Sequence, residues 1–335
     1  MDKIVTFGEV LLRLSPPNNL RFEQAASFNA VYGGSEFNVA LSLAKFGQNV
    51  KFVSRLPENK IADCSILEMH KHGIDTSHIL RGGDRLGLYY MEIGAGLRGS
   101  NVVYDRQHSA MTSINKGMID WESVFKDCSW FHWSGITAGI SEGAAAACLE
   151  AVEVADKMGL TISTDFNYRA NLWKYGKRPS EVMESIVAKC DVVLAGDYAC
   201  AQYFDLHPHG HKDKNLSLAE QLQERFPKLK HIAITQRENV NASHNNWLAV
   251  LYSNTKLITS KTYAITDIVD RIGAGDSFMA GLIYGLSNYG DTQKALEFAV
   301  AASALKHTIA GDANLATIEE IQNLAAGDIS GRVKR

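Results

Sequence analysis

A short stretch near the C-terminus combines two glycines, a carboxylate and the start of a helix. Gly273-Ala274-Gly275-Asp276 is followed by apolar residues at helical spacing, at positions 278, 279, 282, 283 and 286. Unpaired backbone N–H groups and the dipole at a helix N-terminus attract an anion. The Asp276 carboxylate would repel that anion. We therefore interpret Asp276 as a base that takes a proton from the group that attacks the anion. The pattern indicates phosphoryl transfer to a hydroxyl; ordinary helix capping is the alternative.

Two further polar groups lie where α/β proteins bind ligands. Gly33-Gly34 precedes the first long helix, with Ser35 as a plausible N-cap and Asn38 one turn further on. Glycine here lets the backbone approach a ligand closely. The stretch from Asp165 to Trp173 follows a strand-like run. Ligands bind at the C-terminal ends of parallel strands, although a capped turn has the same composition.

Two arginines indicate an acidic ligand. Arg106 ends a strand-like run, and Arg169 lies in the polar stretch after residues 161–164. Guanidinium groups bind carboxylates through paired hydrogen bonds, so two of them near one pocket favour an acidic substrate. The alternative is a pair of surface salt bridges, with Asp105 as the obvious partner of Arg106.

Apolar strands alternate with helices along most of the chain, which predicts an α/β fold with a parallel sheet covered on both faces. There is no linker-like composition and no internal repeat, so we expect one domain over residues 1–335. We expect strands at residues 4–7, 50–53, 130–133, 161–164, 192–194 and 231–235, and helices at 36–46, 61–72, 144–158, 218–225, 277–289 and 292–310.

Two segments, residues 11–31 and 86–105, are strand-like with no helix inside them. The second predicts an antiparallel hairpin, and together they would form a small projecting sheet, placed as a lid over the site. Its turn, Gly94 to Gly99, matches the dinucleotide fingerprint. A functional fingerprint opens a helix, whereas strand-forming residues follow here, so we do not expect a dinucleotide. The chain also lacks the Walker A sequence of P-loop kinases.

Composition restricts the partners. The net charge is −3 and there is no block of basic residues, so neither nucleic acid nor a membrane surface is expected. No apolar run approaches the length of a membrane span, and the N-terminus does not resemble a signal peptide.

Five scattered cysteines without a Cys-x-x-Cys motif suit a reducing cytoplasm. His207, His209 and His211 lie in a polar stretch that we interpret as a solvated loop, and no metal site is expected from protein ligands.

Three features occur in this order along the chain: Gly33-Gly34 with Asn38, the strand-like lid segment, and Gly273-Ala274-Gly275-Asp276. Together they resemble the PfkB or ribokinase-like family of carbohydrate kinases over essentially the whole chain. The resemblance implies a three-layer α/β sandwich with a mostly parallel central sheet and a small projecting β-sheet lid. It implies ATP and Mg²⁺, and admits K⁺ as a further cofactor. It also implies an anion hole at Gly273, Ala274 and Gly275 and a catalytic base at Asp276.

Within the family, the details resemble the kinases of 2-dehydro-3-deoxygluconate. Asp270-Arg271-Ile272 stands where fructokinases and ribokinases usually have threonine. The resemblance implies that the sugar acid is held by Gly34, Tyr89, Tyr104, Arg106, Arg169, Asp276 and Asp312. It implies that ATP is approached by Asn167, Tyr168, Arg169, Thr235, Arg237, Gly273 and Gly275.

The chain departs from the family pattern in two places. The usual Asn-x-x-Glu near the metal should fall at residues 196–199, where neither residue is present and Asp197 is the candidate substitute. The usual glycine-bearing loop reads Gln236-Arg237-Glu238-Asn239-Val240, so the nucleotide contacts there must differ.

The resemblance implies ATP-dependent phosphorylation of the 6-hydroxyl of 2-dehydro-3-deoxy-D-gluconate. The alternatives are a fructokinase or another sugar kinase of the same fold, a non-catalytic sugar-binding regulator, and a dehydrogenase based on the glycine fingerprint. A β-sheet lid with an apolar outer face also leads us to expect a homo-oligomer.

Overall fold

The computed structural model describes residues 3–210 and 213–328. Within this part of the chain, a large sheet has the strand order β13-β12-β11-β10-β9-β8-β1-β4-β5, and β14 pairs with β12. The strands from β5 to β11 along this order are parallel, and β12 pairs antiparallel with β11, β13 and β14. The bounds are β1 (Lys3–Phe7), β4 (Asn49–Leu56), β5 (Ile79–Arg81), β8 (Cys128–Ser134), β9 (Thr161–Asp165), β10 (Val192–Ala195), β11 (His231–Asn241), β12 (His244–Ser253), β13 (Lys256–Thr259) and β14 (Tyr263–Ile265).

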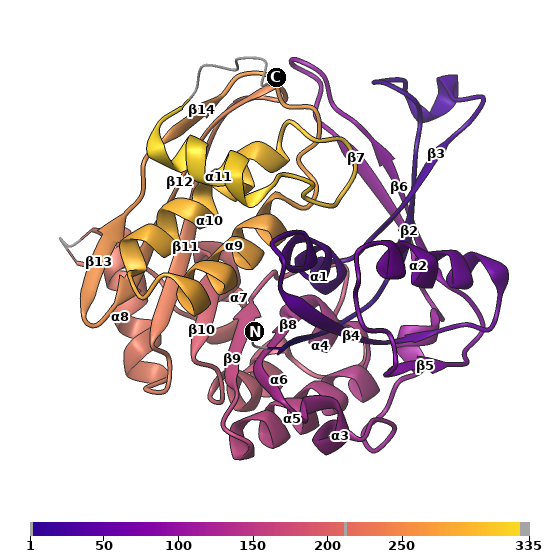
Figure 1. The fold of residues 1–335 in the computed structure, drawn as a ribbon, viewed down its shortest axis with the longest axis horizontal. Helices are drawn as coiled ribbons and strands as arrows, with labels where there is room; N and C mark the ends of the chain where they lie inside the picture. The colour runs from indigo at the N-terminus through magenta and orange to yellow at the C-terminus, as the bar shows by residue number, and fades with distance from the viewer. Residues whose placement is uncertain (1–2, 211–212, 329–335) are drawn as a thin grey trace.

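Helices cover both faces of the large sheet, and each face has its own apolar core (Figure 1). One face packs against α3 (Trp121–Phe125), α4 (Gly135–Ile140), α5 (Glu142–Lys157), α6 (Pro179–Val187), α7 (Asp197–Phe204) and α8 (Lys214–Arg225). The other packs against α1 (Ser35–Lys45), α2 (Lys60–Lys71), α9 (Ala274–Asn288), α10 (Thr292–Lys306) and α11 (Ile318–Ala326). Neighbouring strand residues face opposite cores: Ile4 faces the second and Val5 the first. This confirms the predicted three-layer α/β fold. None of the described helices is both long and apolar enough to span a bilayer.

The predicted small sheet is present and has the strand order β3-β2-β6-β7. Its strands are β2 (Leu11–Ser15), β3 (Asn29–Gly33), β6 (Gly87–Glu92) and β7 (Asn101–Asp105), and short 3₁₀ turns lie at Phe22–Gln24 and Ala110–Ser113. It projects from one side of the main body (Figure 1). The predicted hairpin is β6–β7, in which Leu88 pairs with Asp105. The glycine fingerprint forms its turn and opens no helix, as expected.

Two glycines bring α9 and α10 into close contact. A Cβ atom on Gly281 would lie 2.7 Å from the Cα of Ala299, and one on Gly285 would lie 2.6 Å from the Cα of Ala295. Only glycine allows this approach between the two backbones. The packing fixes the direction of α9, and therefore the place where its N-terminus ends.

The structure differs from the expected elements mainly at their ends. The predicted helix 292–310 ends at Lys306, because the next three N–H groups, at residues 307–309, donate to carbonyls three residues back and form a tighter turn. The His307 carbonyl accepts instead from the Val269 N–H, in the loop before α9, at 2.8 Å. The predicted strand at 231–235 continues to Asn241, since it pairs with β12 along its length. Helices α3, α4, α6, α7 and α11 and strands β5, β12, β13 and β14 were not predicted.

Candidate active site

A cavity of about 820 Å³ lies between the small sheet and the C-terminal edge of the large sheet. All but one of the residues expected to bind sugar or nucleotide line it. They come from the small sheet and the residue after β7, the N-termini of α1 and α9, the loop after β9, β11, and the loop after α10. The lining includes Gly34, Tyr89, Tyr104, Arg106, Asn167, Arg169, Thr235, Arg237, Gly273, Ala274, Gly275, Asp276 and Asp312.

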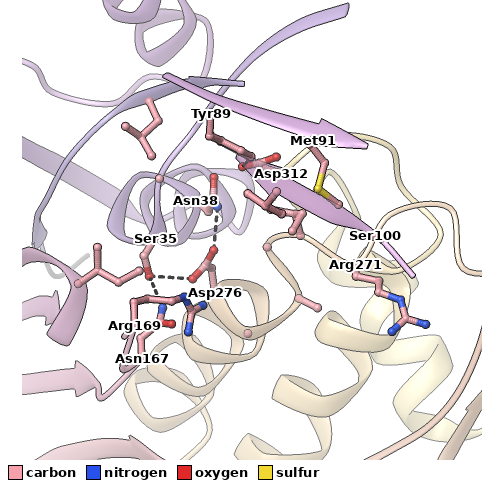
Figure 2. A pocket seen from close by; sticks show the side chains of 18 of the residues that line it. Ser35, Asn38, Tyr89, Met91, Ser100, Asn167, Arg169, Arg271, Asp276 and Asp312 are labelled. Carbon is pink, nitrogen blue, oxygen red and sulfur yellow. Dashed lines mark hydrogen bonds between the residues drawn. The ribbon is translucent and has the colours of Figure 1, made fainter. Parts of the chain in front are cut away.

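Asp276 lies in the first turn of α9, and both of its carboxylate oxygens accept hydrogen bonds (Figure 2). The Ser35 hydroxyl donates to Oδ1 at 2.9 Å, and the Asn38 amide donates to Oδ2 at 2.7 Å. The Asn167 amide donates in turn to the Ser35 hydroxyl at 3.2 Å. Burial raises the pKa of Asp276 to about 6, against the hydrogen bonds from Asn38 and Ser35, which favour the charged form. At neutral pH the carboxylate is therefore mainly ionised and can accept a proton.

The two glycines before Asp276 have different tasks. Gly273 is the N-cap of α9 with φ of 80°, and a Cβ atom there would lie 1.9 Å from the Asp312 carbonyl oxygen. Gly275 meets no atom within 4 Å of such a Cβ, although it lines the cavity. The Ala274 N–H donates to the Arg271 carbonyl at 3.4 Å, whereas no hydrogen bond from the Gly275 N–H is found in the described part of the chain. The first turn of α9 therefore leaves backbone N–H capacity beside open space, which is the geometry of an anion site.

The turn before α1 uses its glycines for contact with the protein itself. A Cβ on Gly33 would lie 2.0 Å from the Asp312 Oδ2, and one on Gly34 would lie 2.1 Å from the Glu9 carbonyl oxygen. Gly34, with φ of 149°, is the N-cap of α1. Ser35 was expected to be the N-cap, which is wrong: it is the first helical residue, and its hydroxyl is directed to Asp276 instead.

Arg106 has an acidic partner inside the protein. Its guanidinium forms an ion pair with Glu9, and both side chains are mostly buried. The expected alternative, a salt bridge between Arg106 and Asp105, is wrong, because Asp105 pairs with Arg85 at 2.7 Å. A large part of the positive charge of Arg106 is therefore already compensated.

Arg169 is different, since no ion pair involves it in the part of the chain that the structure describes. Its guanidinium donates only to the neighbouring Tyr168 carbonyl, at 3.1 Å. Figure 2 shows Arg169 beside Asn167, on the same side of the cavity as Asp276. Its positive charge is available to a ligand.

Asp312 and Tyr89 line the cavity but are bound to each other. The Tyr89 hydroxyl donates to Asp312 Oδ2, and Arg13 donates to Oδ1 at 2.7 Å. Arg13 also pairs with Asp270 at 2.7 Å, and the side chains of Arg13, Asp270 and Asp312 are almost fully buried. Tyr104 packs against the Tyr89 ring with its centroid 5.8 Å away and is partly exposed. This part of the site is a fixed wall.

The opposite end of the cavity is basic. Thr235 and Arg237 project from β11, and Arg271 lies nearby. The Arg271 guanidinium donates to the carbonyls of Asn241 at 2.7 Å and Ala242 at 3.2 Å, and it points away from Asp276 in Figure 2. Burial, and the neighbouring charge of Arg237, lower the pKa of Arg271. Two cations that repel each other favour an anionic ligand.

Two residues singled out in the sequence lie outside the cavity. Tyr168 packs its ring edge-on against Tyr198 and Tyr203, with centroids 5.6 and 5.3 Å away. Asp197, the expected substitute in the missing metal motif, begins α7, and its carboxylate lies 3.7 Å from the ammonium of Lys214.

His211 of the histidine stretch is outside the described residues. No group of three or more His, Cys, Asp or Glu residues within residues 3–210 and 213–328 is arranged to hold a metal ion.

Three further carboxyls that were not predicted to bind sugar or nucleotide line the cavity: Glu9, the partner of Arg106, and Glu36 and Asp165. Glu36 accepts hydrogen bonds from Ser134 and Thr137, and its burial raises its pKa to about 7. Burial and the charge of Asp276 raise the pKa of Asp165 to about 7. The available signals for Glu36 and Asp165 were their positions, at the N-terminus of α1 and at the end of β9.

A model of the pfkB family of carbohydrate kinases matches residues 1–318. A solved structure of a 2-dehydro-3-deoxygluconokinase from Thermotoga maritima is 41% identical, with a TM-score of 0.94 over 98% of this chain and 100% of that chain. A 2-dehydro-3-deoxygalactonokinase from Haloferax volcanii is 30% identical over 98% of both chains. A 5-dehydro-2-deoxygluconokinase from Geobacillus thermodenitrificans is 26% identical over 84% of this chain and 80% of its own.

We predict opposite consequences for two alanine substitutions at the N-terminus of α9. Gly275→Ala adds a methyl group in open space, so it should leave Tm unchanged or slightly higher but weaken ATP binding by about tenfold or more. Gly273→Ala should lower Tm, because of its positive φ and the contact with Asp312. Calorimetric unfolding and ATP titration measure both. Normal ATP affinity in Gly275→Ala would contradict the anion site.

The hydrogen bond from Asn38 should set the acidic limit of turnover. Asn38→Ala removes a donor that favours ionised Asp276, so the pKa of Asp276 rises above about 6. A base is lost when it is protonated, so activity should begin to fall at a pH about one unit higher than in the wild type. The pH profile of kcat/KM measures this. Asn215→Ala, a buried asparagine on α8, is the control and should not move the profile.

Proposed function

This chain belongs to the pfkB family of carbohydrate kinases, and we propose that it transfers the γ-phosphoryl group of ATP to the 6-hydroxyl of 2-dehydro-3-deoxy-D-gluconate. The product would be 2-dehydro-3-deoxy-6-phospho-D-gluconate. The observation that carries the proposal is the pairing of Asp276 with the open N-terminus of α9, in a cavity that Arg169 also lines without an acidic partner. In this proposal the whole chain is one kinase domain, and residues 11–31 and 86–105 form its lid.

The base in this proposal is Asp276. Its carboxylate accepts the proton of the attacking hydroxyl, while Ser35 and Asn38 hold it in place. The backbone N–H groups of the first turn of α9 stabilise the negative charge on the transferred group. The small sheet would exclude water, which competes with the sugar as the nucleophile.

ATP fits the cavity because Gly275 leaves space at the N-terminus of α9, and because Arg237 and Arg271 supply positive charge beyond it. Asn167 and Thr235 line the same path. Mg²⁺ keeps several waters and is usually held by substrate phosphates with one or two carboxylates. Asp165 is the carboxyl at the cavity that fits this role. When bound, Mg²⁺ would neutralise phosphate charge.

The unpaired charge of Arg169 supports a sugar acid. With a neutral sugar, this guanidinium would feel the charges of Asp276 and Asp165 but form no direct ion pair, whereas a substrate carboxylate could pair with it directly. Arg106 would assist from the lid, with Glu9 setting its position. Relatives named for gluconate and for galactonate skeletons both match this chain. The configuration of the substrate hydroxyls must therefore be determined by assaying both sugar acids.

Two further expectations belong to this proposal. The small sheet carries partly exposed apolar side chains, among them Phe28, Val31 and Val103, which supports a homo-oligomer formed through the lid. Light scattering of the purified protein measures its oligomeric state.

The five cysteines are unpaired in the structure, which supports a reducing, cytoplasmic setting. Cell fractionation measures where the protein is located.

The decisive experiment measures ADP release from ATP·Mg²⁺ with a panel of acceptors. The panel contains 2-dehydro-3-deoxygluconate, 2-dehydro-3-deoxygalactonate, 5-dehydro-2-deoxygluconate, fructose, ribose and adenosine. We expect the highest kcat/KM with 2-dehydro-3-deoxygluconate, and a loss of about 10² to 10⁴ in kcat for Asp276→Asn. A higher kcat/KM for fructose than for every acid would overturn the assignment in favour of a fructokinase. Wild-type turnover in Asp276→Asn would remove Asp276 as the base.

Arg169→Ala should raise KM for the sugar acid by about 10- to 100-fold, because one charge-assisted contact is lost. Arg106→Ala should raise it less, since Glu9 already compensates that guanidinium. Steady-state kinetics of both variants measure the difference, with a neutral sugar as the comparison substrate. Equal KM values in the wild type and both variants would refute the carboxylate clamp.

A further inference from the structure

Lys306, the last residue of α10, has no exposed surface. Its ammonium donates to the carbonyl of Ile309 at 3.0 Å and to that of Asp270 at 3.4 Å. These carbonyls belong to two loops, residues 307–312 and 269–273, which meet behind the anion hole. A buried ammonium is costly unless opposite charge lies close to it.

The opposite charge comes from Asp270 and Asp312. Arg13 pairs with both carboxylates at 2.7 Å, so two cations and two anions form one buried cluster. Burial lowers the pKa of Lys306 to about 8, while the charges of Asp270 and Asp312 act in the opposite direction. Lys306 is therefore mainly protonated at neutral pH.

The two loops that Lys306 joins determine the shape of the anion hole. The Gly311 N–H donates to Asp270 Oδ2 at 3.1 Å, and the Ile272 N–H donates to Asp270 Oδ1 at 3.0 Å. The backbone of Gly273 packs directly on the Asp312 carbonyl. A shift of either loop would therefore change the direction of the N–H groups at the start of α9.

The family resemblance allowed K⁺ as a further cofactor. The residues around Lys306 can be compared with the requirements of a K⁺ site. Backbone carbonyl and carboxylate oxygens are ligands that K⁺ uses in proteins. The carbonyls of Asp270 and Ile309 face a common point between the two loops, and the Lys306 ammonium is already bound there. A second cation beside it would meet the repulsion of both Lys306 and Arg13. The residues present do not fit a K⁺ ion that braces these loops.

We propose that Lys306 is a built-in cation that holds the two loops behind the anion hole, so that turnover requires no K⁺ or other monovalent cation. This inference rests on the phosphoryl transfer proposed above. Lys306 is a positioning residue, because it acts on the phosphate site through the backbone of residues 269–273 and 307–312.

The first test uses the wild-type protein. Rates are measured at constant ionic strength in KCl, NaCl and tetramethylammonium chloride. We expect kcat and KM for ATP to differ by less than about twofold among the three salts. Activation by K⁺ of about tenfold or more would overturn the proposal. This test needs no substitution, so it decides the proposal even if every Lys306 variant fails to fold.

The second test creates the vacancy that the lysine fills. Lys306→Met should lower kcat by about tenfold or more in every salt. Lys306→Ala leaves a cavity, and K⁺ or NH₄⁺ should recover part of the lost rate while tetramethylammonium should not. A purely structural lysine would show no such ion-selective recovery. Lys51→Met is the matched control, because Lys51 is also buried and donates to a backbone carbonyl, that of Val124, but lies on β4 and contacts neither of the two loops.

A third measurement separates this proposal from the assignment of the substrate. Mg²⁺·ADP binding is measured by titration calorimetry in the same three salts, without any sugar. Equal affinity in the wild type and a K⁺-dependent affinity in Lys306→Ala would support the built-in cation even if the sugar acid proved to be the wrong acceptor. Wild-type affinity in Lys306→Ala in all salts, together with wild-type kcat in Lys306→Met, would overturn the role of Lys306.

Discussion

The interaction on which the site depends is the buried pairing of Arg13 with Asp270 and Asp312. Arg13 belongs to β2 of the small sheet, Asp270 precedes α9, and Asp312 follows α10. One side chain thus joins the small sheet to both loops that flank the N-terminus of α9, the proposed anion hole. Removal of one member of such a cluster leaves an uncompensated buried charge, which typically costs about 3–5 kcal/mol. The small sheet is therefore attached to the catalytic loops at its second strand.

A second constraint is electrostatic, because the proposed reaction places a carboxylate and an anion side by side. Asp276 shares the first turn of α9 with the N–H groups that would bind phosphate, and Glu36 and Asp165 line the same cavity. Each of the three carboxyls has a raised pKa because of its burial. Asp276 has the lowest of the three values, and two side-chain donors stabilise its charged form. The surroundings thus keep Asp276 mainly ionised near pH 7, as its proposed role as a base requires.

The sequence predicted well those features that are continuous along the chain. The glycines and carboxylate at the start of α9, the β6–β7 hairpin and the strand that leads to Asn167 are each specified by local turn chemistry and hydrophobic periodicity. Whole-chain resemblance added Tyr89 and Asp312, and both line the cavity.

The partners of the charged groups could not be predicted in the same way. Arg13 and Asp312 are 299 residues apart, and Asn38 and Asp276 are 238 apart. Asp105 is adjacent in sequence to Arg106, yet it pairs with Arg85. Neighbouring residues on a strand point to opposite faces of the sheet. Two side chains that are adjacent in the sequence of a strand are therefore expected to lie apart. Tyr168 likewise lies beside Asn167 in the chain but packs in an aromatic cluster outside the cavity.

The far end of the lid gives Arg271 a structural task. The turn of the β6–β7 hairpin reaches the β11–β12 turn, where the Ala242 N–H donates to the Gly96 carbonyl at 2.8 Å and the Gly96 N–H donates to the Ser243 hydroxyl at 3.1 Å. Arg271 holds the same β11–β12 turn through two backbone carbonyls. The lid is thus fixed at Arg13 and meets the basic end of the cavity at its tip. Arg271 lies two residues before Gly273, the N-cap of α9, so the hairpin tip, the β11–β12 turn and the proposed phosphate site are linked through one side chain. In the proposed kinase, a movement of the hairpin tip would therefore be transmitted to the N-terminus of α9.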